Sequence, residues 1–209
     1  MKSKKGVGLL ILCTMFVCTN LVEATLTIAT FDDPAGGSDS AFFRVDLTNN
    51  LITGGWDDSK TGLNLDVVYS GNPFPDAFFT MTPVSYTGGL MGGPTGGGII
   101  KFFADGQSTG MTPLIQIEFD SANLSPTSFG GVELFGNDLT ISGSEIGGAT
   151  LTDEAFSFGF ANQVLLNNDW DDGFTATAAF TSSAVPEPAT LALLGIGALA
   201  TLTRRRRPA

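Results

Sequence analysis

The sequence predicts an all-β, antiparallel domain of the sandwich or jelly-roll type. Short segments alternate apolar and polar residues with a period of two, and Gly, Pro, Asn and Asp separate these segments. No amphipathic helix pattern of about 10 residues occurs between residues 25 and 184. One apolar and one polar face per strand is what an antiparallel sheet with a solvated side requires, and many short strands favour a sandwich.

The alternation places the strands along the chain. In the segment 43–47, Phe43, Val45 and Leu47 would share one face, with Arg44 and Asp46 on the other. Strands with this clear pattern are expected at 43–47, 63–69, 115–119, 156–160 and 174–180, and weaker ones at 26–28, 100–102 and 139–141. The stretch Gly88–Gly98 holds 7 glycines in 11 residues, so it is expected to be an irregular surface loop.

Phenylalanine is the expected core residue. The chain has 17 Phe against two Trp and two Tyr. Phe brings large apolar area without a polar atom that needs a partner. These side chains are therefore expected to fill the space between two sheet layers.

The N-terminus has the layout of a secretory signal peptide. Lys2, Lys4 and Lys5 precede an apolar run at 6–17, and Ala24 offers a small residue for cleavage. We expect cleavage after Ala24, with an uncleaved anchor as the alternative. The predicted organisation is a signal peptide at 1–24, one exported acidic domain at 25–184 and a C-terminal segment at 185–209.

The C-terminal segment has three parts. Residues 185–188 read Val-Pro-Glu-Pro, 189–203 form an apolar run of 15 residues, and 204–209 are a basic tail. A helix over the run would span roughly 22 Å, which makes a short transmembrane helix. Arg204, Arg205, Arg206 and Arg207 would hold its end in the cytoplasm. Residues 181–185 are expected to be a short linker.

This arrangement resembles the PEP-CTERM sorting signal of Gram-negative bacteria, over about the last 25 residues. Pro186, Glu187 and Pro188 match its motif position for position, and the resemblance assigns them to recognition by an exosortase. It implies export, transient retention in the inner membrane, and sorting to the cell surface or extracellular matrix, commonly in association with exopolysaccharide and biofilm. The alternative is a plain tail anchor with an incidental Pro-Glu-Pro.

Composition narrows the function of the exported domain. Residues 25–184 contain 19 acidic and three basic residues, a formal net charge of -16. A field of this sign repels phosphate backbones, so no nucleic-acid partner is expected. Both cysteines, Cys13 and Cys18, lie in the predicted signal peptide, so a disulfide-free domain is expected.

No catalytic site is expected. Ser108 lies in a Gly-x-Ser-x-Gly pattern, but the chain has no histidine to take the serine proton. Glu118 and Asp120 would share a strand face, and paired carboxylates can hydrolyse glycosides. They also fit a simple solvated face, so a carboxylate-based glycosidase is only a remote alternative.

Two kinds of binding residue remain. Asp169, Asp171 and Asp172 offer hard oxygen ligands for Ca²⁺, although an acidic turn before a strand is the simpler explanation. Trp56 and Trp170 could stack on sugar rings, or lie half-buried at a sheet edge. No other cofactor is expected.

The sequence therefore favours an exported surface or matrix protein without catalytic activity, structural or associated with exopolysaccharide. The alternative is a Ca²⁺-dependent carbohydrate-binding or adhesion module.

Overall fold

The computed structural model describes residues 25–33, 42–89, 91–126 and 132–186. Strands make up nearly all of the regular structure there, and they pair antiparallel throughout. The predicted all-β antiparallel class is confirmed. The described residues contain no helix long and apolar enough to cross a membrane, and the predicted spanning segment at 189–203 lies outside them.

The fifteen strands are short except for the last two. Their bounds are β1 Leu26–Phe31, β2 Phe43–Asp46, β3 Leu51–Trp56, β4 Leu65–Val67, β5 Asn72–Phe74, β6 Phe78–Met81, β7 Val84–Ser85, β8 Gly93–Thr95, β9 Gly98–Phe103, β10 Ile115–Phe119, β11 Ala122–Pro126, β12 Val132–Asn137, β13 Leu139–Ser142, β14 Leu151–Leu165 and β15 Gly173–Pro186. Two 3-10 turns, η1 Leu166–Asn168 and η2 Trp170–Asp172, join β14 to β15.

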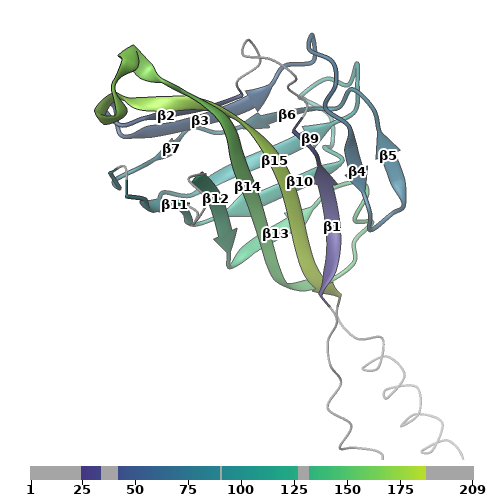
Figure 1. The fold of residues 1–209 in the computed structure, drawn as a ribbon. Helices are drawn as coiled ribbons and strands as arrows, with labels where there is room; N and C mark the ends of the chain where they lie inside the picture. Colours follow the sequence, from purple (N-terminus) through teal and green to yellow (C-terminus); the bar gives the residue numbers. More distant parts are fainter. Residues whose placement is uncertain (1–24, 34–41, 90, 127–131, 187–209) are drawn as a thin grey trace, which may run out of the picture.

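The strands form one curled sheet that folds over on itself (Figure 1). The order along it is β13-β10-β9-β6-β3-β2-β15-β14-β12-β11-β8, with β1, β4, β5 and β7 beside this path. Strand β3 connects the two layers, because its first residues pair with β2 and its last two pair with β6. Gly54 lies at this change of partner, where a Cβ atom would come 2.6 Å from the Phe43 ring.

Strand β15 is paired along both edges. On one side β14 follows it from Leu165 to Leu151. On the other side β2 pairs with its first residues and β1 with its last ones. The pairing with β14 is interrupted by two bulges, where Asp153 and Asn162 both have a φ of 49°. Short polar residues tolerate this conformation best, which explains the residue types at the bulges.

The core is a continuous cluster of Phe rings between the two layers. Phe31 on β1 stacks on Phe180 of β15 with centroids 5.3 Å apart, and Phe158 lies 4.8 Å from Phe180. Rings from both layers complete the cluster: Phe42, Phe43, Phe79, Phe102, Phe156 and Phe160. All of these side chains are buried, as the composition predicted.

Two local expectations were wrong. Part of Gly88–Gly98 is strand, because β8 pairs with β11 and β9 begins at Gly98. At Gly92 a Cβ atom would lie 2.4 Å from the Leu124 carbonyl oxygen, so glycine permits close approach there. Residues 181–185 are not a linker but the end of β15, paired with β1 and β14.

The Ser182 hydroxyl completes the hydrogen bonding where the pairing of β1 with β15 is irregular. The register shifts between Thr27 and Ala29, and the buried Ser182 fills the gap. Its Oγ accepts from the Ala29 amide at 3.2 Å and lies 3.3 Å from the Ala29 carbonyl oxygen. The hydroxyl thus satisfies a buried backbone group that the ladder leaves without a partner.

We expect Ser182→Ala to lower the free energy of unfolding by about 1–3 kcal/mol, because the buried Ala29 amide would lose its acceptor. Urea denaturation measures the change. The matched control is Ser183→Ala on the same strand, which should shift stability by no more than about 0.5 kcal/mol. Equal effects of the two variants would contradict this role of Ser182.

The turn after β2 is held by one carboxylate. Asp46 accepts from Arg44 Nη2 at 2.8 Å, from the Asn49 amide at 2.9 Å and from Asn49 Nδ2 at 3.0 Å. The bond from Arg44, followed by the bonds from Asn49, lowers the pKa of Asp46 to about 2. The charged form of this carboxylate therefore stabilises the folded state.

The sign of the pH effect follows. An unfolded Asp has a pKa of about 3.9, so the contribution of Asp46 is complete above about pH 4. It is lost as the pH falls through about 2. We expect Asp46→Asn to lower Tm at neutral pH and to flatten the fall of Tm between those pH values. A fall as steep as that of the wild type would contradict the assignment.

Candidate functional site

The C-terminal segment begins inside the folded domain. Ala184 and Val185 are buried in β15, and Pro186 is the last residue of that strand. Ala184 pairs with Leu26 of β1, and Val185 with Thr152 of β14, whose Oγ1 donates to the Val185 carbonyl oxygen at 3.1 Å. Of the three predicted recognition residues, only Pro186 is described. Glu187, Pro188, the basic residues 204–207 and the predicted signal peptide lie outside the described residues.

The two ends of the domain lie together. The first residues of β1 pair with the last residues of β15, so both strands reach the same pole of the molecule (Figure 1). The turns η1 and η2 lie at the other end of the β14–β15 hairpin. The 14 residues of β15 make a path of roughly 45 Å along the strand from one pole to the other.

Trp170 is exposed at the hairpin tip. Its side chain is 47% accessible, and its ring meets Phe174 edge-on at 6.3 Å. Val164 nearby on β14 is also exposed. A ring supported by Phe174 and open to solvent is available to stack on a ligand.

The predicted acidic residues brace the same tip. Asp169 Oδ1 accepts from the Asp171 amide at 3.0 Å, and Asp172 accepts from Thr48 Oγ1 at 3.1 Å and from Asn167 Nδ2 at 3.0 Å. Within the described ranges, no three acidic, His or Cys side chains are grouped so as to hold a metal. The hydrogen bonds account for Asp169 and Asp172 as parts of the turn.

Trp56 lies in a different environment. Its ring is 2% exposed, packs edge-on against Phe42 at 5.4 Å and lies under the Lys60 ammonium, with Nζ 4.9 Å from the ring centroid. This cation–π contact and the burial keep the ring face away from solvent. The indole Nε1 is buried without a hydrogen-bond partner among the described residues.

A polar hollow opens beside Trp56. Its floor is Gly54, Gly55 and residues 78–81 of β6, and its rim is formed by Asp57, Asp58, Lys60 and residues 107–109. Asp58 Oδ1 accepts from the Gly106 amide at 3.0 Å and so ties the two rim loops together. A shallower hollow on the other side of Gly54 and Gly55 is lined by Arg44, Thr53 and Thr175.

Sequence analysis did not predict these hollows, although it considered Ser108, on the rim of the first, as a catalytic residue. Alternation places Thr53 and Thr80 on an outer face, but it does not reveal that β3 brings them together. The sequence feature that could have pointed to these hollows is the scarcity of basic residues. Arg44 and Lys60, which line them, are two of the three basic residues in 25–184.

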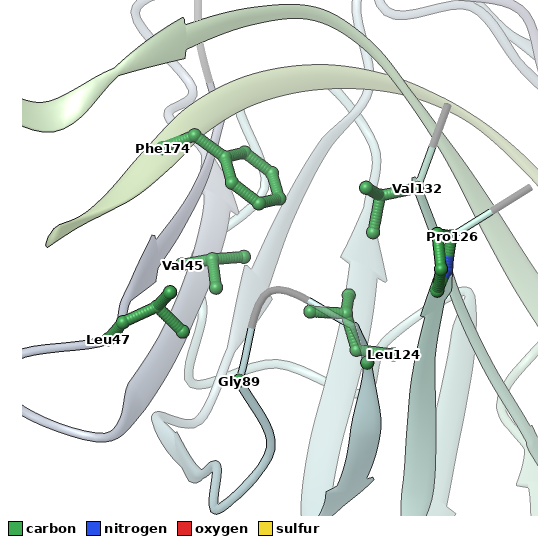
Figure 2. A pocket seen from close by; sticks show the side chains of 8 residues that line it. Val45, Leu47, Gly89, Leu124, Pro126, Val132 and Phe174 are labelled. Carbon is green, nitrogen blue, oxygen red and sulfur yellow. The ribbon is translucent and has the colours of Figure 1, made fainter. Parts of the chain in front are cut away.

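A further space, separate from the two hollows, is apolar and too small for a ligand. Val45, Leu47, Leu124, Pro126, Val132 and Phe174 converge on it from β2, β11, β12 and β15 (Figure 2). The free volume is about 10 Å³, no more than one water occupies. It is a packing gap between strands.

The residues considered for catalysis are all exposed. Ser108 is on an exposed loop, where its Oγ accepts from the Gly110 amide at 3.3 Å. Glu118 and Asp120 are exposed on and just after β10, on either side of the buried Phe119. Ser108 has no basic hydrogen-bond partner among the bonds of the described residues.

Comparison with known proteins identifies only the C-terminal segment. Residues 184–207 match the family model described as the PEP-CTERM protein-sorting motif, which confirms the predicted resemblance. No curated protein and no solved structure matches the chain. The chain therefore carries a PEP-CTERM sorting motif, which implies processing by an exosortase, membrane association of the C-terminus, and export with surface sorting in a Gram-negative bacterium.

Proposed function

We propose that the protein is a non-enzymatic component of the cell surface or extracellular matrix, structural and associated with exopolysaccharide. The observation that carries this proposal is the continuity of the sorting motif with β15. The motif match starts at Ala184, a buried residue of a strand paired on both edges. A membrane anchor joined at that point would be attached directly to the folded sheet, without a flexible linker between them.

This continuity would also orient the domain. With the C-terminal pole at the inner membrane, the tip of the β14–β15 hairpin would point away from it (Figure 1). Trp170 would then lie on the side of the domain that faces away from that membrane. After removal of the C-terminal segment, the same domain would enter the cell surface or matrix with its fold intact.

Three features support a role without catalysis. The chain has no histidine. Ser108 hydrogen-bonds only within its own loop among the described contacts. Glu118 and Asp120 resemble the carboxylate pair of a glycosidase only in being two neighbouring carboxylates.

We expect the released protein to begin near Thr25 and to end close to Pro188. Intact mass spectrometry of membrane and released fractions, from cells with and without the exosortase, measures both ends. Glu187→Ala alters the motif beyond β15 and should reduce release, whereas the fold variant Ser183→Ala should not. A species that retains Arg204–Arg207 in every fraction would make this an ordinary tail-anchored protein.

The alternative is a Ca²⁺-dependent binding or adhesion module. Its support is the position of Asp169, Asp171 and Asp172 together on the exposed tip. The three carboxylates are not grouped as a metal site among the described residues, so under this alternative a hard cation would have to draw them together as it binds.

Under the leading proposal, we expect the Tm in millimolar Ca²⁺ to equal the Tm in the same concentration of Mg²⁺. Thermal unfolding of the released protein after EDTA treatment measures this. A rise of Tm specific to Ca²⁺ and absent in Asp171→Asn would favour the alternative.

A further inference from the structure

One row of outward-facing residues crosses both layers of the sheet. Thr175, Arg44 and Thr53 are direct partners on β15, β2 and β3. Two positions further along β3 the row resumes, and partners on β6, β9, β10 and β13 continue it. The polar row is Thr175, Arg44, Thr53, Gly55, Thr80, Lys101, Gln116 and Ser142, and none of these residues is buried.

The row has the shape of a site for a chain. It crosses seven strands, a path of roughly 30 Å at the usual spacing of about 4.8 Å. The two hollows beside Gly54 and Gly55 lie along this path and share these glycines. A flexible chain that follows the curl of the sheet across the strands would pass through both hollows.

Gly55 has no packing reason to be glycine. A Cβ atom there would meet only the Phe79 carbonyl oxygen, at the ordinary contact distance of 3.4 Å, whereas at Gly54 it would collide with Phe43. Glycine inside a strand weakens it and often marks close approach of a ligand. The absence of a side chain at Gly55 leaves the row open at its middle.

The chemistry of the row suits hydroxyl groups. Its side chains are hydroxyls, one amide and two cations, without a carboxylate. The charge of Arg44 is balanced by Asp46 through Nε and Nη2, and a guanidinium has five N–H donors, so others remain. The hollow beside Trp56 adds Lys60, Gln107, Asp57 and Asp58, which offer donors and acceptors together.

Net charge selects among polysaccharides. Residues 25–184 carry -16, and Arg44, Lys60 and Lys101 are their only basic residues. All three lie in the row or in the hollow beside it. Asp46, Asp57 and Asp58 lie beside the row or in the same hollow, so three negative charges match these three positive ones, and the net charge of -16 disfavours a polyanion.

We propose that the polar row binds a neutral, hydroxyl-rich polysaccharide laid across the strands. Thr80, Lys101 and Gln116 would hydrogen-bond its hydroxyls, and the chain would lie closest to the sheet at Gly55. This proposal rests on the proposed association with exopolysaccharide and assigns that association to a surface.

The test uses the released protein in affinity electrophoresis. The probe is exopolysaccharide from the producing cells, separated by anion exchange into a neutral and an anionic fraction. We expect the neutral fraction to retard the protein and the anionic fraction to have little effect. Gly55→Ile, which would fill the hollow, and Thr80→Val, which removes one hydroxyl, should weaken retardation, the first by at least tenfold.

Control variants distinguish loss of binding at the polar row from loss of the fold and from binding at the hairpin tip. Gly55→Ala fits the available space and should bind nearly as well as the wild type, as should Thr27→Val on the exposed side of β1. Unchanged Tm verifies the fold of each variant. Full retardation of Gly55→Ile, loss in Trp170→Ala alone, or binding of only the anionic fraction would overturn the proposal. Correct processing without binding to the neutral fraction would reject the row while leaving the proposed sorting intact.

Discussion

The pairing of β15 on both of its edges is the constraint on which the other features depend. This strand holds β14 along one side and β2 and β1 in succession along the other. Its buried rings, Phe174 and Phe180, meet rings of β14 and β1. Because the same strand ends at Pro186, the start of the sorting motif is part of the hydrophobic core and cannot move independently of it.

The second organising feature is the change of partner along β3. Its first half belongs with β2 and its last two residues with β6, so this strand makes one sheet out of two layers. Gly54 allows the Phe43 ring to pack against the strand at this point. Gly55, beside it, leaves the outer surface open. Adjacent glycines thus serve the interior and the exterior separately.

The sequence predicted eight of the fifteen strands, those in which alternation reports burial directly. Val45, Ile117 and Phe158 are buried as their pattern required. The β8 strand could not be predicted, since glycine composition argues against strands and its pairing depends on close backbone approach to Leu124. The end of β15 was misjudged as a linker because Thr181, Ser182 and Ser183 look like loop residues, while Ser182 in fact completes a bulge.

The candidate sites, too, could be predicted from the sequence only in part. Trp56 and Trp170 are each followed by two aspartates and could not be distinguished from sequence, yet one is covered by Lys60 and the other is exposed. Trp56 packs against Phe42 in the core, whereas Trp170 meets Phe174, four residues further along the chain at the hairpin tip. The polar row depends on register between strands distant in sequence, so no local pattern contains it.

The shared pole of β1 and β15 has a mechanical consequence. Force that separates the two chain ends acts at Leu26 and Ala184, where it opens the ladder one hydrogen bond at a time. Force between Pro186 and a ligand on the outer face runs along β15 instead, perpendicular to its hydrogen bonds, and many of them share it at once. We therefore expect the domain to resist force applied along β15 better than force that pulls its two ends apart.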